Sequence, residues 1–201
     1  HFIMNGKIFG ADNKTTLTAF WRKADNMLVL SRAGLDYWSY FNDSRGKIRG
    51  IELESNFNWN KFDLNLSAAY MHYNLERRDT AAQYENWQSV WPTYSPEWEG
   101  SLRLNYNPTS KLSIFSELKY VDEMFTSRNK DITNGGYDSY LKGMPQSSLT
   151  TVGAGFKYKP KEDMQLTFGC NDIFNEGPKC KIYYDGGYVN NDFPIQGRTY
   201  Y

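Results

Sequence analysis

The sequence lacks several features that define common classes of protein. Its 201 residues contain no run of 18 apolar residues, which excludes a transmembrane helix. Two histidines are too few for a histidine-rich metal cluster. Lys and Arg number 23 together, and Asp and Glu also number 23. The net charge of zero therefore gives no electrostatic reason to expect nucleic acid as a partner.

A secretory signal is also missing from the first ten residues, which have neither a basic segment nor an apolar core. We expect either that such a segment has been removed or that the chain is a piece of a longer protein. Cysteine is scarce, but Cys170 and Cys180 are close enough in sequence to form a disulfide. In an exported protein we expect this disulfide to form, and the alternative is two free thiols.

The strongest pattern that is present lies in residues 50–73. Apolar and polar residues alternate there with a period of two, which indicates strands with one apolar and one polar face. Asn60 and Lys61 interrupt the pattern, and so short a turn makes the two strands pair antiparallel. The strands are longer than the usual five or six residues. The apolar positions are Ile51, Leu53, Phe57, Trp59, Phe62, Leu64, Leu66, Ala68 and Tyr70.

Similar alternation predicts seven more strands, and the connections between all of them alternate between short and long. Short turns lie at Gly10, Asn60, Asn107 and Lys159, and long loops begin at Ala24, Leu75, Asp122 and Glu176. In an up-and-down sheet, all short turns then lie at one end, as in outer-membrane barrels. The further predicted strands are residues 2–9, 15–23, 98–106, 112–120, 149–158, 164–171 and an incomplete 198–201.

Aromatic residues make up 17% of the chain. In four strands, residues eight positions apart on one face have an aromatic at one or both ends, namely Phe62–Tyr70, Trp98–Tyr106, Leu112–Tyr120 and Thr150–Tyr158. Eight tilted residues span about 20 Å, which is close to the height of the apolar band of a membrane barrel. We therefore predict two aromatic girdles. The periplasmic girdle contains Trp59, Phe62, Tyr106 and Tyr158, and the outer girdle contains Tyr70, Trp98 and Tyr120.

Four short motifs make the chain resemble the C-terminal barrel of TonB-dependent outer-membrane receptors. They are Arg49-Gly50-Ile51-Glu52, Pro96-Glu97 before a strand, Asn171-Asp172-Ile173-Phe174-Asn175, and Gly197-Arg198-Thr199-Tyr200-Tyr201. The resemblance implies an all-β fold, an antiparallel up-and-down transmembrane β-barrel, of which residues 1–201 would form about the last nine of 22 strands. The plug domain, the TonB-contacting segment and the end of the final strand are then missing.

No catalytic constellation stands out, so we expect neither an enzyme nor a bound cofactor. His72 is expected to be an interfacial residue rather than a metal or haem ligand. The carboxylates of Glu52, Glu54, Asp63 and Glu117 are expected to be solvated groups of the barrel lumen. Function would then lie in the long loops, whose aromatic residues offer platforms for a flat or macrocyclic ligand. These candidates are Trp87, Trp91, Tyr94, Tyr137 and Tyr140, and packing within the loops is the alternative.

The resemblance implies a receptor in the outer membrane of a Gram-negative bacterium that imports a large, scarce nutrient with energy from TonB. A ferric siderophore is the first choice, followed by haem or cobalamin, and then by a glycan or peptide. The expected partners are outer-membrane lipid, the extracellular ligand and the TonB complex through the missing N-terminal part, with a surface lipoprotein left open. The alternatives are a non-transporting barrel, such as an adhesin or a barrel enzyme, and a soluble β-sandwich lectin.

Overall fold

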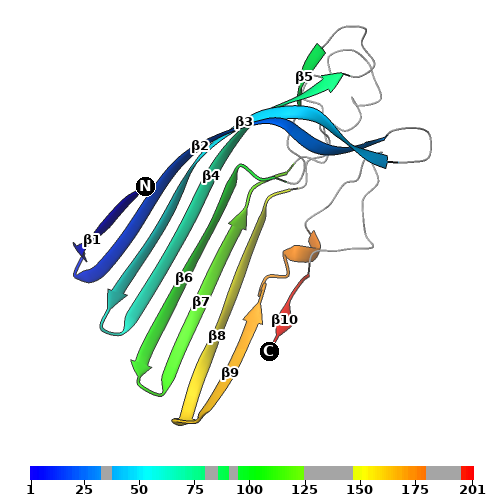
Figure 1. Ribbon diagram of the computed structural model, residues 1–201. Coiled ribbons are helices and arrows are strands. Elements are labelled where there is room, and N and C mark those ends of the chain that lie inside the picture. Colours follow the sequence, from blue (N-terminus) through cyan, green and yellow to red (C-terminus); the bar gives the residue numbers. More distant parts are fainter. Residues whose placement is uncertain (33–37, 80–85, 91–94, 125–146, 180–195) are drawn as a thin grey trace.

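The computed structural model describes residues 1–32, 38–79, 86–90, 95–124, 147–179 and 196–201. These residues form one antiparallel sheet, which Figure 1 shows as an open, twisted surface. Strands that are neighbours in sequence are neighbours in the sheet, apart from the short β5. The predicted all-β, up-and-down architecture is therefore confirmed. A β-sandwich is excluded for the described residues, because their strands all lie in one sheet.

Nine strands follow one another across the sheet, in agreement with the nine that the alternation predicts. Their bounds are β1 (Phe2–Ile8), β2 (Ala11–Arg32), β3 (Trp38–Trp59), β4 (Phe62–Asp79), β6 (Trp98–Thr109), β7 (Leu112–Val121), β8 (Leu149–Lys161), β9 (Met164–Asn171) and β10 (Thr199–Tyr200). One further strand, β5 (Asn86–Val90), pairs with the end of β4, and a single helical turn, η2 (Gly177–Lys179), follows β9.

All four short turns lie at the same end of the sheet, the lower end in Figure 1, and the strand ends that lead into the long connections lie at the other. Each turn consists of two residues, which makes the turns near Asn107 and Lys159 tighter than the sequence suggests. In the first turn Phe9 and Gly10 both have positive φ, 51° and 77°. This conformation is that of a type I′ turn, whose twist matches that of the flanking strands.

The predicted loops 24–46 and 75–97 are partly wrong, because the strands continue far into them. β2 and β3 remain paired up to Arg32 and Trp38, and β4 continues to Asp79. A β-bulge shifts the register between Ala24 and Met27, and Asn26 there has a φ of 58°. Because a bulge adds one residue to one strand, it breaks the period of two while the pairing continues.

The strand register places apolar side chains together on one face of the sheet. Directly paired residues include Leu64 with Leu104 and Leu66 with Leu102, and the polar pair Ser67 and Ser101 lies on the opposite face. Large side chains on the apolar face, such as Leu118 and Phe168, remain exposed. Among the described residues, the buried hydrophobic ones are Ala11 and Phe115 alone. A single sheet of this kind has no core of its own, and its apolar face requires lipid.

The aromatic residues lie at the two ends of the apolar face, as predicted. Phe62 and Tyr106 stack with their ring centroids 4.6 Å apart near the short turns. Tyr70 and Trp98 also lie 4.6 Å apart, at the end toward the long connections. Cross-strand aromatic pairs of this kind stabilise neighbouring strands.

Ser55 interrupts the apolar face, and its hydroxyl is satisfied within the sheet. Asn13 Nδ2 donates to Ser55 Oγ at 3.1 Å, and the hydroxyls of Thr15 and Ser55 lie 2.6 Å apart. Thr15 Oγ1 also donates to Asn13 Oδ1 at 2.9 Å. Because lipid offers no hydrogen-bond partners, such a closed network lets polar side chains occupy this face.

Candidate functional site

The polar face of the sheet carries the carboxylates that the sequence assigns to the lumen, and the structure spreads them over several strands. Asp63 accepts hydrogen bonds from the amides of Asn58 and Asn107, the latter at 3.0 Å. Glu117 pairs with Lys119 at 3.1 Å. These carboxylates are thus held by amides or a cation, which is the behaviour expected of solvated lumen groups rather than of an acid–base pair.

A depression on this face is lined by more acidic than basic side chains. Glu52, Glu54 and Glu99 line it together with Lys119. Glu52 and Glu54 have no cationic partner within the described part of the chain. A wet face with unpaired acidic groups fits the wall of a lumen that contacts water or a positively charged surface.

Above the outer girdle, β4 carries two ionisable residues toward the long connections. His72 Nδ1 lies 3.3 Å from Glu97 Oε1, and its role as an interfacial residue stays a prediction. Tyr73 lies beyond Tyr70 and so outside the membrane-spanning part of the strand. Burial raises the pKa of Tyr73, and the carboxylate of Glu99 raises it further.

The five predicted ligand-binding aromatics are located only in part. Trp87 lies on β5, where its backbone pairs with that of Arg78 at the end of the sheet that carries the long connections. Trp91, Tyr94, Tyr137 and Tyr140 lie outside the described residues. Their contact with a ligand therefore stays a prediction.

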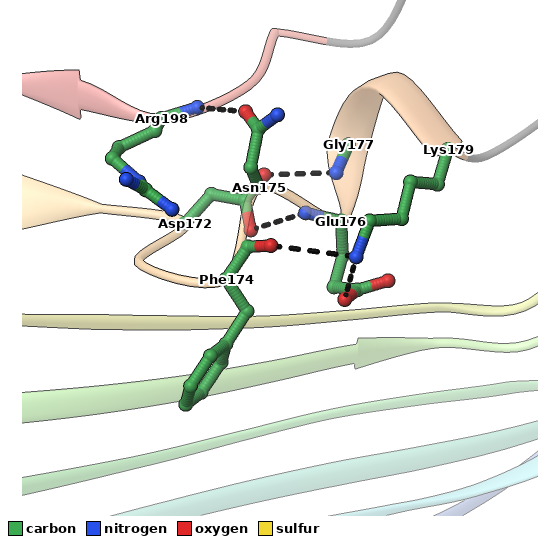
Figure 2. A network of polar contacts seen from close by, with 7 residues as sticks. All are labelled: Asp172, Phe174, Asn175, Glu176, Gly177, Lys179 and Arg198. Atoms are coloured by element: carbon green, nitrogen blue, oxygen red, sulfur yellow. Dashed lines mark hydrogen bonds and ion pairs between the residues drawn. The ribbon is translucent and has the colours of Figure 1, made fainter.

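A network of polar contacts is built on the motif Asn171-Asp172-Ile173-Phe174-Asn175, at the end of β9 (Figure 2). Asp172 is buried, and its two carboxylate oxygens accept hydrogen bonds from the backbone N–H groups of Glu176 and Gly177 at 2.9 and 2.8 Å. Asp172 and Asn175 both have left-handed backbones, with φ values of 46° and 56°. Asn and Asp tolerate this conformation best among the non-glycine residues.

Asn175 connects this turn to the last strand. Its side-chain oxygen accepts a hydrogen bond from the backbone N–H of Arg198 at 3.0 Å, just before β10. Lys179 Nζ adds an ion pair with Glu176 at 2.6 Å. Sequence reasoning found the motif but gave it no role. The two Asx residues at turn positions are the signal that could have revealed it.

Cys170 carries a free thiol in the structure, and its Sγ donates a hydrogen bond to the carbonyl oxygen of Asn171 at 3.5 Å. It belongs to the apolar face, where it is paired with Ala154. Cys180 lies outside the described residues, so the Cys170–Cys180 disulfide stays a prediction.

The described residues contain no group of three or more His, Cys, Asp or Glu side chains arranged to hold a metal ion. No helix in the described part of the chain is long and apolar enough to cross a membrane.

Comparison with solved structures gives consistent matches to one class of receptor. The ferric-catecholate import receptor Fiu from Escherichia coli K12 has a TM-score of 0.62 at 14% identity, over 94% of this chain and 24% of that one. The siderophore receptor PirA from Acinetobacter baumannii has a TM-score of 0.64 at 17% identity, over 94% and 28%. The ferric enterobactin receptor PfeA from Pseudomonas aeruginosa has a TM-score of 0.62 at 15% identity, over 98% and 29%.

The chain thus spans less than a third of the length of these solved receptors. At these identities the matches establish the fold. A comparison with curated proteins finds no match.

The family models give the assignment. Residues 6–173 match the model described as TonB dependent receptor-like, beta-barrel. This match covers most of the chain and agrees with the sheet, the aromatic girdles and the sorted turns. The chain therefore belongs to the TonB-dependent receptor family, and it forms part of a β-barrel in the outer membrane of a Gram-negative bacterium.

Proposed function

We propose that the whole protein imports a ferric siderophore across the outer membrane, with energy supplied through TonB. The observation that supports this most directly is the family match over residues 6–173, together with solved neighbours that are described as siderophore and ferric enterobactin receptors. The family is one of transporters and receptors, which argues against an enzyme.

We also propose that residues 1–201 are the C-terminal part of the barrel. The short β10 begins just after Arg198, in the segment that resembles the start of the family's final strand. An isolated sheet with two free edges is unstable in a membrane, because the unpaired backbone groups of each edge face lipid. The remaining strands and the plug would come from the rest of the receptor.

Recognition would take place above the outer girdle, on the loops that follow the long strands. We propose that Trp87, Trp91, Tyr94, Tyr137 and Tyr140 contact the ligand there. Trp87 supports this, because β5 extends the sheet at the end that would face the cell exterior. Aromatic side chains can pack on the planar rings of a ligand, such as the catechol rings of a ferric catecholate, with little loss of side-chain entropy.

The experiment is a binding titration of the full-length receptor, purified in detergent, by quenching of its tryptophan fluorescence. Ferric catecholate and ferric hydroxamate siderophores, haem and cyanocobalamin are each added to separate samples. We expect saturable binding of one ferric siderophore class. Saturable binding of haem or cyanocobalamin alone would contradict the proposed ligand.

Trp87→Ala tests the position of the site, and Trp59→Ala is its matched control at the opposite end of the sheet. Loss of a central aromatic contact weakens binding by about tenfold or more. We expect that loss for Trp87→Ala and an unchanged dissociation constant for Trp59→Ala. Equal affinities of the two variants would remove Trp87 from the site while leaving the ligand assignment intact.

A further inference from the structure

The apolar face of β2, β3 and β4 changes character immediately above the outer girdle. Strand register gives the sequence of rows on this face from the membrane upward. Ile51 pairs with Tyr70, then Arg49 pairs with His72, and then Lys47 pairs with Asn74. On the other side of β3, Trp21 pairs with Arg49 and Lys23 pairs with Lys47. Along the same face of the sheet, apolar side chains are therefore followed by basic ones.

Two of these basic residues form a cross-strand pair of like charge. Lys23 and Lys47 are directly opposite each other, and like charges in that position destabilise a sheet. Lys23 has one acidic neighbour, Asp25, at 2.9 Å. Lys47 and Arg49 have no acidic partner among the residues that the structure describes. We call Lys23, Lys47 and Arg49 the basic strip.

A hollow lies beside the basic strip, and its lining shows that nearby acids do not neutralise it. Lys23, Lys47 and Arg45 line this hollow together with Asp25 and Glu76. Arg45 already pairs with Glu76, at 2.5 Å. The acids of the hollow are thus matched to Lys23 and Arg45. Glu97 lies 3.3 Å from His72, the cross-strand partner of Arg49, and in the described part of the chain it forms no ion pair with Arg49. The charges of Lys47 and Arg49 are therefore left for an outside anion.

The height of the basic strip matches a particular layer of the membrane. Two residues along a strand tilted by roughly 40° rise about 5 Å, so Arg49 lies about 5 Å and Lys47 about 10 Å above the row of Tyr70. The headgroup layer on one side of a bilayer begins at the edge of the hydrocarbon and is about 5–8 Å thick. Arg49 therefore lies within this layer, and Lys47 and its partner Lys23 lie just above it, where their long side chains can reach back to the headgroups. Trp21, which is 63% exposed in the row of Arg49, fits the same interface.

We propose that the basic strip binds the phosphate groups of lipid headgroups in the outer leaflet. Lys47 and Arg49 present N–H donors and unpaired positive charges to an anion that the membrane itself supplies at this depth. Lys23 adds N–H donors beside them, and its pair with Asp25 neutralises the acid that would repel that anion. The occupant is a lipid rather than a soluble ligand, because the strip continues the lipid-facing side of the sheet and not the lumen side. This inference does not depend on which nutrient the receptor imports.

The test uses the full-length receptor, delipidated in detergent and titrated with bisphosphorylated lipid A, with bound lipid counted by native mass spectrometry. Wild type is also titrated with lipid A from which both phosphates have been removed. We expect the bisphosphorylated form to bind and the dephosphorylated form to bind at least about tenfold more weakly. If wild type bound bisphosphorylated and dephosphorylated lipid A equally well, the proposal would be overturned.

The variant is Lys23→Gln/Lys47→Gln/Arg49→Gln. Its matched control, Lys61→Gln/Lys111→Gln/Lys159→Gln, removes the same charge from two short turns and from the adjoining end of β8, at the opposite end of the sheet. A basic residue near an anionic membrane surface strengthens binding by about fivefold, so the strip variant is expected to bind roughly 100-fold more weakly. The control is expected to bind like wild type. A strip variant that binds like wild type, or a control that loses as much affinity, would overturn the proposal.

Discussion

Asp172 gives the sharpest prediction, because its buried carboxylate satisfies two backbone N–H groups at once. Its side chain accepts from Glu176 at 2.9 Å and from Gly177 at 2.8 Å, and the residue is only 5% exposed. In Asp172→Ala both donors lose their acceptor in a place that water reaches poorly. A hydrogen bond to a charged group contributes about 1.5–3 kcal/mol.

The backbone conformation of Asp172 adds to the free-energy cost of Asp172→Ala. Asp172 has a φ of 46°, and an ordinary residue with a Cβ costs about 1–2 kcal/mol in this conformation. Together these effects predict that Asp172→Ala makes local opening of the turn easier by at least about 4 kcal/mol. Asp172→Asn is the matched control, since it keeps one acceptor oxygen and tolerates the left-handed backbone. We expect it to cost about 1–2 kcal/mol.

Hydrogen exchange of the full-length receptor, followed by mass spectrometry of its peptides, measures this local opening. For Asp172→Ala we expect peptides that cover residues 171–179 and 196–201 to exchange at least about 700-fold faster, because every 1.4 kcal/mol is a factor of ten. Peptides from β6 and β7 serve as the internal standard and are expected to be unchanged. Exchange of residues 171–179 that stays within about threefold of wild type would refute the reasoning.

Two further predictions concern the faces of the sheet, and both use the thermal midpoint at which the folded receptor loses its faster gel migration. Leu102→Arg places a charge on the lipid face and is expected to cost about 2–4 kcal/mol, whereas Ser101→Arg on the lumen face is expected to cost little; equal losses would contradict the assigned faces. Gly155→Ala is expected to cost about 1–3 kcal/mol, because a Cβ there would meet the Phe115 ring at 2.6 Å. Gly6→Ala is its control, since a Cβ at Gly6 meets nothing within 4 Å, and a Gly155→Ala midpoint equal to that of Gly6→Ala would disprove the contact.

The sheet could be predicted from the sequence because one face of each strand meets lipid and the other meets water. Lipid on one side and water on the other enforce a strict period of two, as residues 50–73 show, and the register then follows from the turn at Asn60 and Lys61. The aromatic pairs Phe62–Tyr106 and Tyr70–Trp98 came from the same pattern.

The upper ends of the strands escaped prediction for a physical reason. Above the membrane both faces of β2 and β3 meet water, so the period of two loses its cause. The bulge at Asn26 then changes its phase. The short β5 gave no signal either, because five residues are too few for a clear alternation.

The turn around Asp172 and the basic strip were missed because each depends on residues brought together by pairing. Asn175 meets Arg198 across a long stretch of chain, and Lys23 meets Lys47 across two strands. Neither contact produces a periodic pattern or a local motif in the sequence, so neither can be predicted before the strand register is known.

The central claim is that this barrel belongs to an importer of ferric siderophores. It is tested most directly by the uptake of radiolabelled iron, supplied as a ferric siderophore, into cells whose sole siderophore receptor is the full-length protein. We predict saturable accumulation that stops when TonB is deleted or when the receptor is absent. Accumulation no faster than in receptor-free cells, or at the same rate without TonB, would contradict the account.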